Sequence, residues 1–157
     1  MLWRGRSIVR KVLERNSRIE RVCKILTVDK NVNLFQAYQE VEILKKLNHP
    51  NIVQIVEYFT QPNFLYIVLE HIPGKSLHEL YYLQEIRNLD IIISILRQVL
   101  IALKFCHEKG YVHKAVNPEH IMILKLEKSK SYLVKLVGFG RALRKGAPKL
   151  SNKVVSV

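Results

Sequence analysis

Three histidines and one cysteine in the second half of the sequence are side chains that commonly bind metal ions. They are Cys106, His107, His113 and His120. The histidines are six and seven residues apart, which does not match the short spacings of zinc sites. The pattern therefore argues against a zinc site. His113, at the end of an apolar stretch, is more typical of a histidine packed in a core.

Lys24 and Glu40 are a second candidate pair, one in an alternating segment and the other in a segment with helical spacing. By themselves, a lysine and a glutamate of this kind usually end as two solvated surface charges. Their significance therefore depends on the segments around them.

Two patterns in the first fifty residues predict how these charges are positioned. Residues 7–26 alternate loosely between apolar and polar types around an Asn-Ser pair, which predicts two strands joined by a turn. Apolar residues then recur every three or four positions over residues 35–47, until an Asn-His-Pro sequence at 48–50 ends the predicted helix. Lys24 thus lies on a strand and Glu40 on the next helix.

The rest of the chain changes from strands to helix and back. Residues 52–59 and 64–69 are two β-rich segments separated by a Gln-Pro-Asn turn. A helix is predicted over residues 90–109, capped by Asp90, and its apolar residues cover nearly every face, so we expect it to be buried on all sides. Short strands follow at residues 121–124 and 132–137.

The order of these elements, and five motifs within them, resembles the protein kinases. The motifs are RVCKIL around Lys24, YQEVEILKKLNHPNIV with Glu40, FLYIVLEHIPGKSL, YVHKAVNPEHIMI and VKLVGFGRA. They resemble, in order, the strand with the nucleotide-binding lysine, the C helix, the strand and hinge that meet adenine, the catalytic loop, and the Asp-Phe-Gly segment. The resemblance extends over about residues 5–145, and calmodulin-regulated and giant muscle kinases look most similar.

The resemblance implies an α+β fold of the protein-kinase type. Residues 1–73 would form an antiparallel β lobe with the C helix, and residues 74–145 an incomplete, mainly helical lobe that ends just after the Asp-Phe-Gly position. Residues 146–157 would form a basic tail. In such a fold an internal apolar column would contain Leu44, Ile55, His113 and Phe139.

The resemblance also implies a nucleotide pocket. Its residues would be Val22, Lys24, Glu40, Glu70, Ile72 and Met122. Lys24 would pair with Glu40, and the backbone at Glu70 and Ile72 would meet adenine. Two features weaken this pocket. Val22 is larger than the alanine usual at its position, and the loop that would cover the phosphates has one glycine, Gly5, where the family has three.

Four positions that support phosphoryl transfer in the family hold other residues here. Ala115 occupies the position of the aspartate that accepts the substrate proton, and Asn117 occupies the position of a lysine. His120 and Gly138 stand for an asparagine and an aspartate that bind Mg²⁺, an ion that prefers oxygen ligands. We therefore expect no enzyme activity and no bound metal. The sequence predicts a pseudokinase without a required cofactor, in which ATP could bind without Mg²⁺.

The predicted helix over residues 90–109 suggests a surface for a partner. In protein kinases a later helix covers part of it, and this chain stops at Val157, before such a helix. Each Leu or Ile left uncovered forgoes roughly 1.5–3 kcal/mol of burial. We expect a protein partner or a second copy of the chain to cover this face, which favours a scaffolding or other protein-interaction role.

Three other functions stay open. One is a metal-independent ATP sensor, and another is a protein serine/threonine kinase-related protein with residual activity. The third is a basic nucleic-acid-binding protein. Residues 1–24 hold eight Lys and Arg against two Glu, and residues 125–157 hold nine against one, in a chain of net charge +13. Few aromatic residues lie among these charges for base stacking, so we do not favour nucleic acid as a partner.

Cysteine usage and hydropathy bear on the compartment. Cys23 and Cys106 are far apart within apolar segments, which argues against a disulfide and favours a reducing compartment. The apolar run Ile91–Ile95 is interrupted by Ser94 and followed by Arg97, so it is too short to span a bilayer. We expect a cytoplasmic protein without membrane contact.

Overall fold

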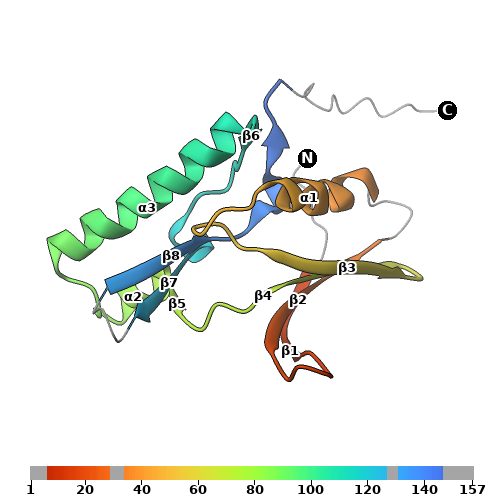
Figure 1. The fold of residues 1–157 in the computed structure, drawn as a ribbon, viewed down its shortest axis with the longest axis horizontal. Coiled ribbons are helices and arrows are strands. Elements are labelled where there is room, and N and C mark those ends of the chain that lie inside the picture. Colours follow the sequence, from red (N-terminus) through yellow and green to blue (C-terminus); the bar gives the residue numbers. More distant parts are fainter. Residues whose placement is uncertain (1–6, 29–33, 127–130, 147–157) are drawn as a thin grey trace.

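The structure, a computed structural model, describes residues 7–28, 34–126 and 131–146 (Figure 1). Two lobes are visible, one built on the β1–β4 sheet and the other on the long helix α3 with β7 and β8 beside it. This arrangement agrees with the predicted α+β fold. The predicted phosphate-covering loop with Gly5 and most of the predicted 146–157 tail lie outside the described residues.

A four-stranded antiparallel sheet with the order β1-β2-β4-β3 forms the first lobe. Its strands are β1 (Ser7–Leu13), β2 (Glu20–Thr27), β3 (Ile55–Gln61) and β4 (Phe64–Glu70). Both predicted hairpins are confirmed. However, β3 begins three residues later than predicted, because Ile52 bridges to Leu136 and the Val53 N–H donates to the Leu136 carbonyl in the other lobe.

The predicted helix between the hairpins is also confirmed, as α1 (Leu34–Lys46). Val41 of this helix packs in an apolar cluster with Leu26 of β2 and with Leu65 and Ile67 of β4. Each of these residues is at most 1% exposed. Because Glu40 is the neighbour of Val41, the same packing holds its carboxylate against the sheet.

The second lobe combines short strands with two helices. β5 (Lys75–Ser76), β7 (Ile121–Leu126) and β8 (Ser131–Leu136) form a three-stranded sheet, and β6 (Tyr111–Val112) pairs with β9 (Leu143–Arg144). Two 3-10 helices, η1 (Pro118–His120) and η2 (Phe139–Arg141), precede β7 and β9 respectively. The predicted strands at 121–124 and 132–137 correspond to β7 and β8.

Helix α2 (Leu77–Tyr82) was not predicted from the sequence. Its start is a capping box, in which the Ser76 hydroxyl accepts from the Glu79 N–H and the Glu79 carboxylate accepts from the Ser76 N–H. The Ser-x-x-Glu pattern at residues 76–79 is the signal that could have found it.

The long helix α3 (Leu89–Glu108) lies along β8 (Figure 1). It begins one residue earlier than predicted, and its cap is Asn88, whose side-chain oxygen accepts from the N–H groups of Asp90 and Ile91. Asp90 instead lies in the first turn, where its charge suits the helix dipole.

The expectation that α3 is buried on all sides is wrong. One stripe faces the core and comprises Ile95, Val99, Ala102 and Cys106. The opposite stripe is between 46% and 65% exposed and comprises Ile93, Leu96, Leu100 and Ile101. Within the described ranges, no helix has both the length and the hydropathy needed to cross a membrane.

One continuous core joins the two lobes. It includes Leu44 of α1, Leu47 and Ile52 after that helix, Leu136 of β8, and Phe139. A polar link accompanies it, because the Asn51 amide donates to Gln98 of α3 and to the Val134 carbonyl of β8. Apolar packing and hydrogen bonds therefore both connect the two lobes. The division of the chain at residues 73 and 145 stays a prediction.

Candidate functional site

A cavity of about 490 Å³ lies between the two lobes. It is lined by every residue of the implied nucleotide pocket, namely Val22, Lys24, Glu40, Glu70, Ile72 and Met122. His120 and Gly138 also line it, whereas Ala115 and Asn117 lie in the neighbouring loop and not in its wall. The structure thus brings these residues together, while their role in binding a nucleotide stays a prediction.

A buried ion pair stands at one end of this cavity. Lys24 Nζ lies 2.5 Å from Glu40 Oε2, and the two side chains are only 14% and 5% exposed. The backbone of Gly140 closes against the pair, since a Cβ there would lie 3.1 Å from Lys24 Nζ and 3.2 Å from Glu40 Oε2. At this depth each charge requires the other as a partner.

The other end of the cavity is mainly apolar. Its wall is formed by Val22, Val53, Leu69, Ile72, Met122 and Val137. Apart from Lys24 and Glu40, the Lys and Glu residues that line the cavity are Lys11 and Glu70. The Glu70 carboxylate accepts from Lys135 Nζ at 2.6 Å and from the Gln54 N–H at 2.8 Å. This end therefore suits a flat apolar ring, and its carboxylate is already in an ion pair.

His120 is held at three points in the cavity wall. Its N–H donates to the Asn117 side chain at 3.0 Å, and its carbonyl accepts from the Val137 N–H at 2.9 Å. Its ring Nδ1 lies 2.7 Å from the Ala115 carbonyl. Because a carbonyl oxygen can only accept, Nδ1 must carry a proton, which leaves Nε2 as the ring nitrogen free for a ligand.

The His120 ring lies directly over Gly138. A Cβ on Gly138 would be 2.5 Å from the ring Cδ2 and 2.7 Å from Nε2, far closer than two such atoms can approach. Gly138 also has a φ of +80°, which disfavours most side chains. The imidazole therefore occupies the space that any side chain at position 138 would need.

The buried His113 supports this loop from beneath. Its Nε2–H donates to the Val137 carbonyl at 2.9 Å, its Nδ1 accepts from the Ala115 N–H at 3.2 Å, and its ring packs edge-on against Phe139 at 4.5 Å. Burial lowers the pKa of His113, and the neighbouring His120 lowers it further. The prediction of a packed core histidine is confirmed, at 1% exposure.

The donors in the cavity do not fit Mg²⁺, which the resemblance implies. This ion prefers near-octahedral oxygen ligands. His120 offers a nitrogen and Gly138 no side chain, while Glu40 and Glu70 are both in ion pairs. In the part of the chain that the structure describes, no three His, Cys, Asp or Glu residues are grouped to hold a metal ion.

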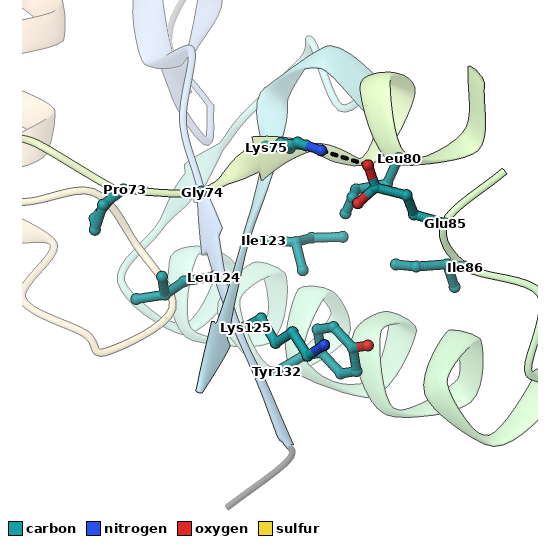
Figure 2. Close-up of a pocket in the computed structure, with 10 residues that line it drawn as sticks. All are labelled: Pro73, Gly74, Lys75, Leu80, Glu85, Ile86, Ile123, Leu124, Lys125 and Tyr132. Carbon is teal, nitrogen blue, oxygen red and sulfur yellow. Dashed lines mark hydrogen bonds and ion pairs between the residues drawn. The ribbon is translucent and has the colours of Figure 1, made fainter. Parts of the chain in front are cut away.

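A second and larger cavity, of about 680 Å³, lies on the far side of β7 (Figure 2). Leu80, Ile86 and Ile123 point into it, and an ion pair between Lys75 and Glu85 spans its upper rim in the view. None of the predicted site residues lines it. The larger cavity has no buried ion pair among its described lining residues. We therefore take the smaller cavity, between the lobes, as the candidate site.

Comparison with known proteins agrees with this fold. The model of the protein kinase domain matches residues 5–156. The calcium/calmodulin-dependent protein kinase type II of Caenorhabditis elegans is 30% identical over 139 residues, which are 87% of this chain and 19% of that protein. The serine/threonine-protein kinase RAD53 of Saccharomyces cerevisiae is 32% identical over 139 residues, which are 88% of this chain and 17% of that protein.

A third relative, cyclin-dependent kinase-like 4 of Mus musculus, is 35% identical over 106 residues. They amount to 68% of this chain and 30% of that protein. The chain thus spans less than a third of the length of each of these three relatives.

These matches contradict the prediction that the chain is not an enzyme. That prediction rested on four positions, Ala115, Asn117, His120 and Gly138, whereas the kinase model matches the sequence across all of them and the relatives are named as protein kinases. Substitutions at four positions are weaker evidence than the two-lobe arrangement of the whole chain and its buried Lys24–Glu40 ion pair. The earlier resemblance is confirmed, and the chain belongs to the protein kinase family.

Proposed function

We propose that this protein kinase domain binds an adenine nucleotide in the cavity between its lobes and does not require Mg²⁺ to do so. The observation that supports the proposal is the buried Lys24–Glu40 pair at one end of a cavity that is apolar at the other. Its volume of about 490 Å³ lies in the usual range for small-molecule sites.

The distribution of charge in the cavity favours one orientation of the nucleotide. The phosphates lie at the end with the Lys24 ammonium, because Glu40 holds that group in place without fully neutralising a polyanion. The base lies between Val22 and Met122, and the backbone at Glu70 and Ile72 supplies its hydrogen bonds. Lys24 is therefore the side chain that most directly tests the proposal.

We expect ATP or ADP, in the presence of EDTA, to raise the melting temperature of the wild-type protein. At a concentration of one hundred times Kd, the shift should be about 5–10 °C for a domain of this size. Lys24→Ala should lose most of this shift, measured against its own ligand-free melting temperature, because the phosphates lose their cation. Lys45→Ala is the control, since Lys45 is 48% exposed on α1 and does not line the cavity.

Lys24→Ala also leaves Glu40 buried without its partner, so a second variant is needed. Val22→Phe fills the base end of the cavity and leaves the ion pair intact. It should likewise abolish the shift. A wild-type protein that shows no shift at saturating nucleotide would rule out the proposed function.

Phosphoryl transfer to a protein is a second candidate function, favoured by the family match. The chain covers only part of its relatives, so their activities and substrates are proposals for this chain. The test is transfer of labelled γ-phosphate to a mixture of protein substrates with Mg²⁺, with Mn²⁺ and with EDTA. Labelling that is lost in Lys24→Ala would support it, and labelling that persists there would indicate a contaminating kinase.

We also propose that the exposed stripe of α3 binds protein, with a second copy of the chain as its occupant. Its residues Ile93, Leu96, Leu100 and Ile101 recur at the spacing of helix-to-helix contacts and form a shallow apolar groove with Arg97 and Lys104. A stripe of this kind packs readily against the same stripe of another copy.

Leu100→Glu should prevent this self-association without unfolding the protein, because Leu100 is 65% exposed. Sedimentation velocity over a range of concentrations should show a wild-type dimer and a monomeric variant. Leu83→Glu is the matched control, since Leu83 is 57% exposed but lies outside the stripe. Wild-type protein that stays monomeric at every concentration would contradict the proposal.

A further inference from the structure

His120 and Gly138 form a mutually dependent pair at the phosphate end of the cavity. The ring of His120 lies where a Cβ of Gly138 would have to be, at 2.5 Å from the ring Cδ2. The ring cannot readily turn away, because its Nδ1–H is bonded to the Ala115 carbonyl at 2.7 Å. The position of the imidazole therefore depends on the glycine.

The charged groups around this pair leave no place for a divalent cation. Lys24 from β2 and Glu40 from α1 neutralise one another, and the neighbouring ring of His113, 6.1 Å away, is bonded through both nitrogens. The other carboxylate of the cavity, on Glu70, is paired with Lys135. Among the described lining residues, each carboxylate is thus already bound to a lysine.

We propose that the His120–Gly138 pair selects the metal-free form of the nucleotide, an inference that rests on the nucleotide binding proposed above. The imidazole takes the space in which an oxygen ligand at position 138 would stand, with Nε2 2.7 Å from the position of a Gly138 Cβ. A nucleotide that arrives with Mg²⁺ would bring a hydrated cation against the His120 ring and the Lys24 ammonium. Mg²⁺ therefore competes with the protein for the nucleotide.

The mutual dependence can be tested without any ligand, by a double-mutant cycle in which the melting temperature of each variant is measured. Gly138→Ala should destabilise the protein in the wild-type background and clearly less in a His120→Ala background, where the clashing ring is gone. The strain of alanine at φ +80° is common to both backgrounds and cancels. Gly110→Ala is the matched control, because Gly110 has the same φ of +80° but nothing within 4 Å of its added Cβ.

The metal preference is tested with the double variant His120→Asn plus Gly138→Asp. These substitutions add an amide oxygen and a carboxylate, which Mg²⁺ prefers, and aspartate tolerates positive φ better than most residues. Calorimetric titration with ADP should show that Mg²⁺ weakens binding to the wild type. In the double variant Mg²⁺ should tighten binding by about tenfold or more, the scale on which supporting residues alter metal affinity.

The outcomes separate this inference from the function on which it rests. If the wild type binds ADP and Mg²⁺ tightens binding as much as in the double variant, the inference is overturned and the proposed function stands. If ADP does not bind in EDTA, the proposed function fails. A melting-temperature cycle in which the two alanine substitutions are additive also overturns the inference, whatever the nucleotide result.

Discussion

Replacing Glu40 with alanine is expected to lower the free energy of unfolding by about 3–5 kcal/mol. The Glu40 carboxylate is 5% exposed, and it is the ion-pair partner of Lys24 at 2.5 Å. Without it the ammonium stays in a largely buried position with no opposite charge. The cost of that unpaired charge exceeds the value of the ion pair itself, because both groups have already lost most of their hydration.

Urea unfolding of Glu40→Ala and Glu42→Ala gives a matched comparison within one helix. Glu42 pairs with Lys45 at 3.7 Å, but both side chains are about half exposed, so its loss should cost at most about 0.5 kcal/mol. A double variant, Lys24→Met with Glu40→Leu, should recover much of the stability because no charge is left buried. A Glu40→Ala protein as stable as Glu42→Ala would show that water reaches Lys24 through the cavity.

Much of the fold could be predicted because its signals are local. The alternation over residues 7–26 and the turn residues around Asn63 predict hairpins, and the structure shows them. The two faces of α3 could not be predicted in the same way. Ile and Leu occupy both of them, and only the contact with β8 decides which stripe is buried.

The site was predictable only as a set of residue types. Motif order places Lys24 beside Glu40, and the structure brings them to 2.5 Å. The relation between His120 and Gly138 could not be predicted, because the residues are 18 positions apart and their contact depends on a positive φ and on the hydrogen bond to Ala115. The wrong prediction about enzyme activity came from interpreting each substituted position separately. That interpretation leaves out how neighbouring substitutions fit together.

Phe139→Ala is the second substitution for which we expect a large effect, a loss of about 3–5 kcal/mol in the free energy of unfolding. The Phe139 ring is 1% exposed, belongs to the core that joins both lobes, and packs edge-on against His113 at 4.5 Å. Truncation leaves a cavity beside that imidazole. The surrounding side chains cannot fill it, because His113 is tied to Val137 and Ala115 by hydrogen bonds.

The position of Phe139 next to Gly138 gives the same substitution a second consequence. If its ring anchors the segment that lines the cavity, Phe139→Ala should weaken nucleotide binding as well as stability, although it touches no ligand. Phe64→Ala is the control for size alone, since Phe64 is 38% exposed on β4. It should cost about 1 kcal/mol or less and leave the nucleotide-induced shift in melting temperature unchanged. A Phe139→Ala protein with the stability of Phe64→Ala would show that the core between the lobes can close around the missing ring.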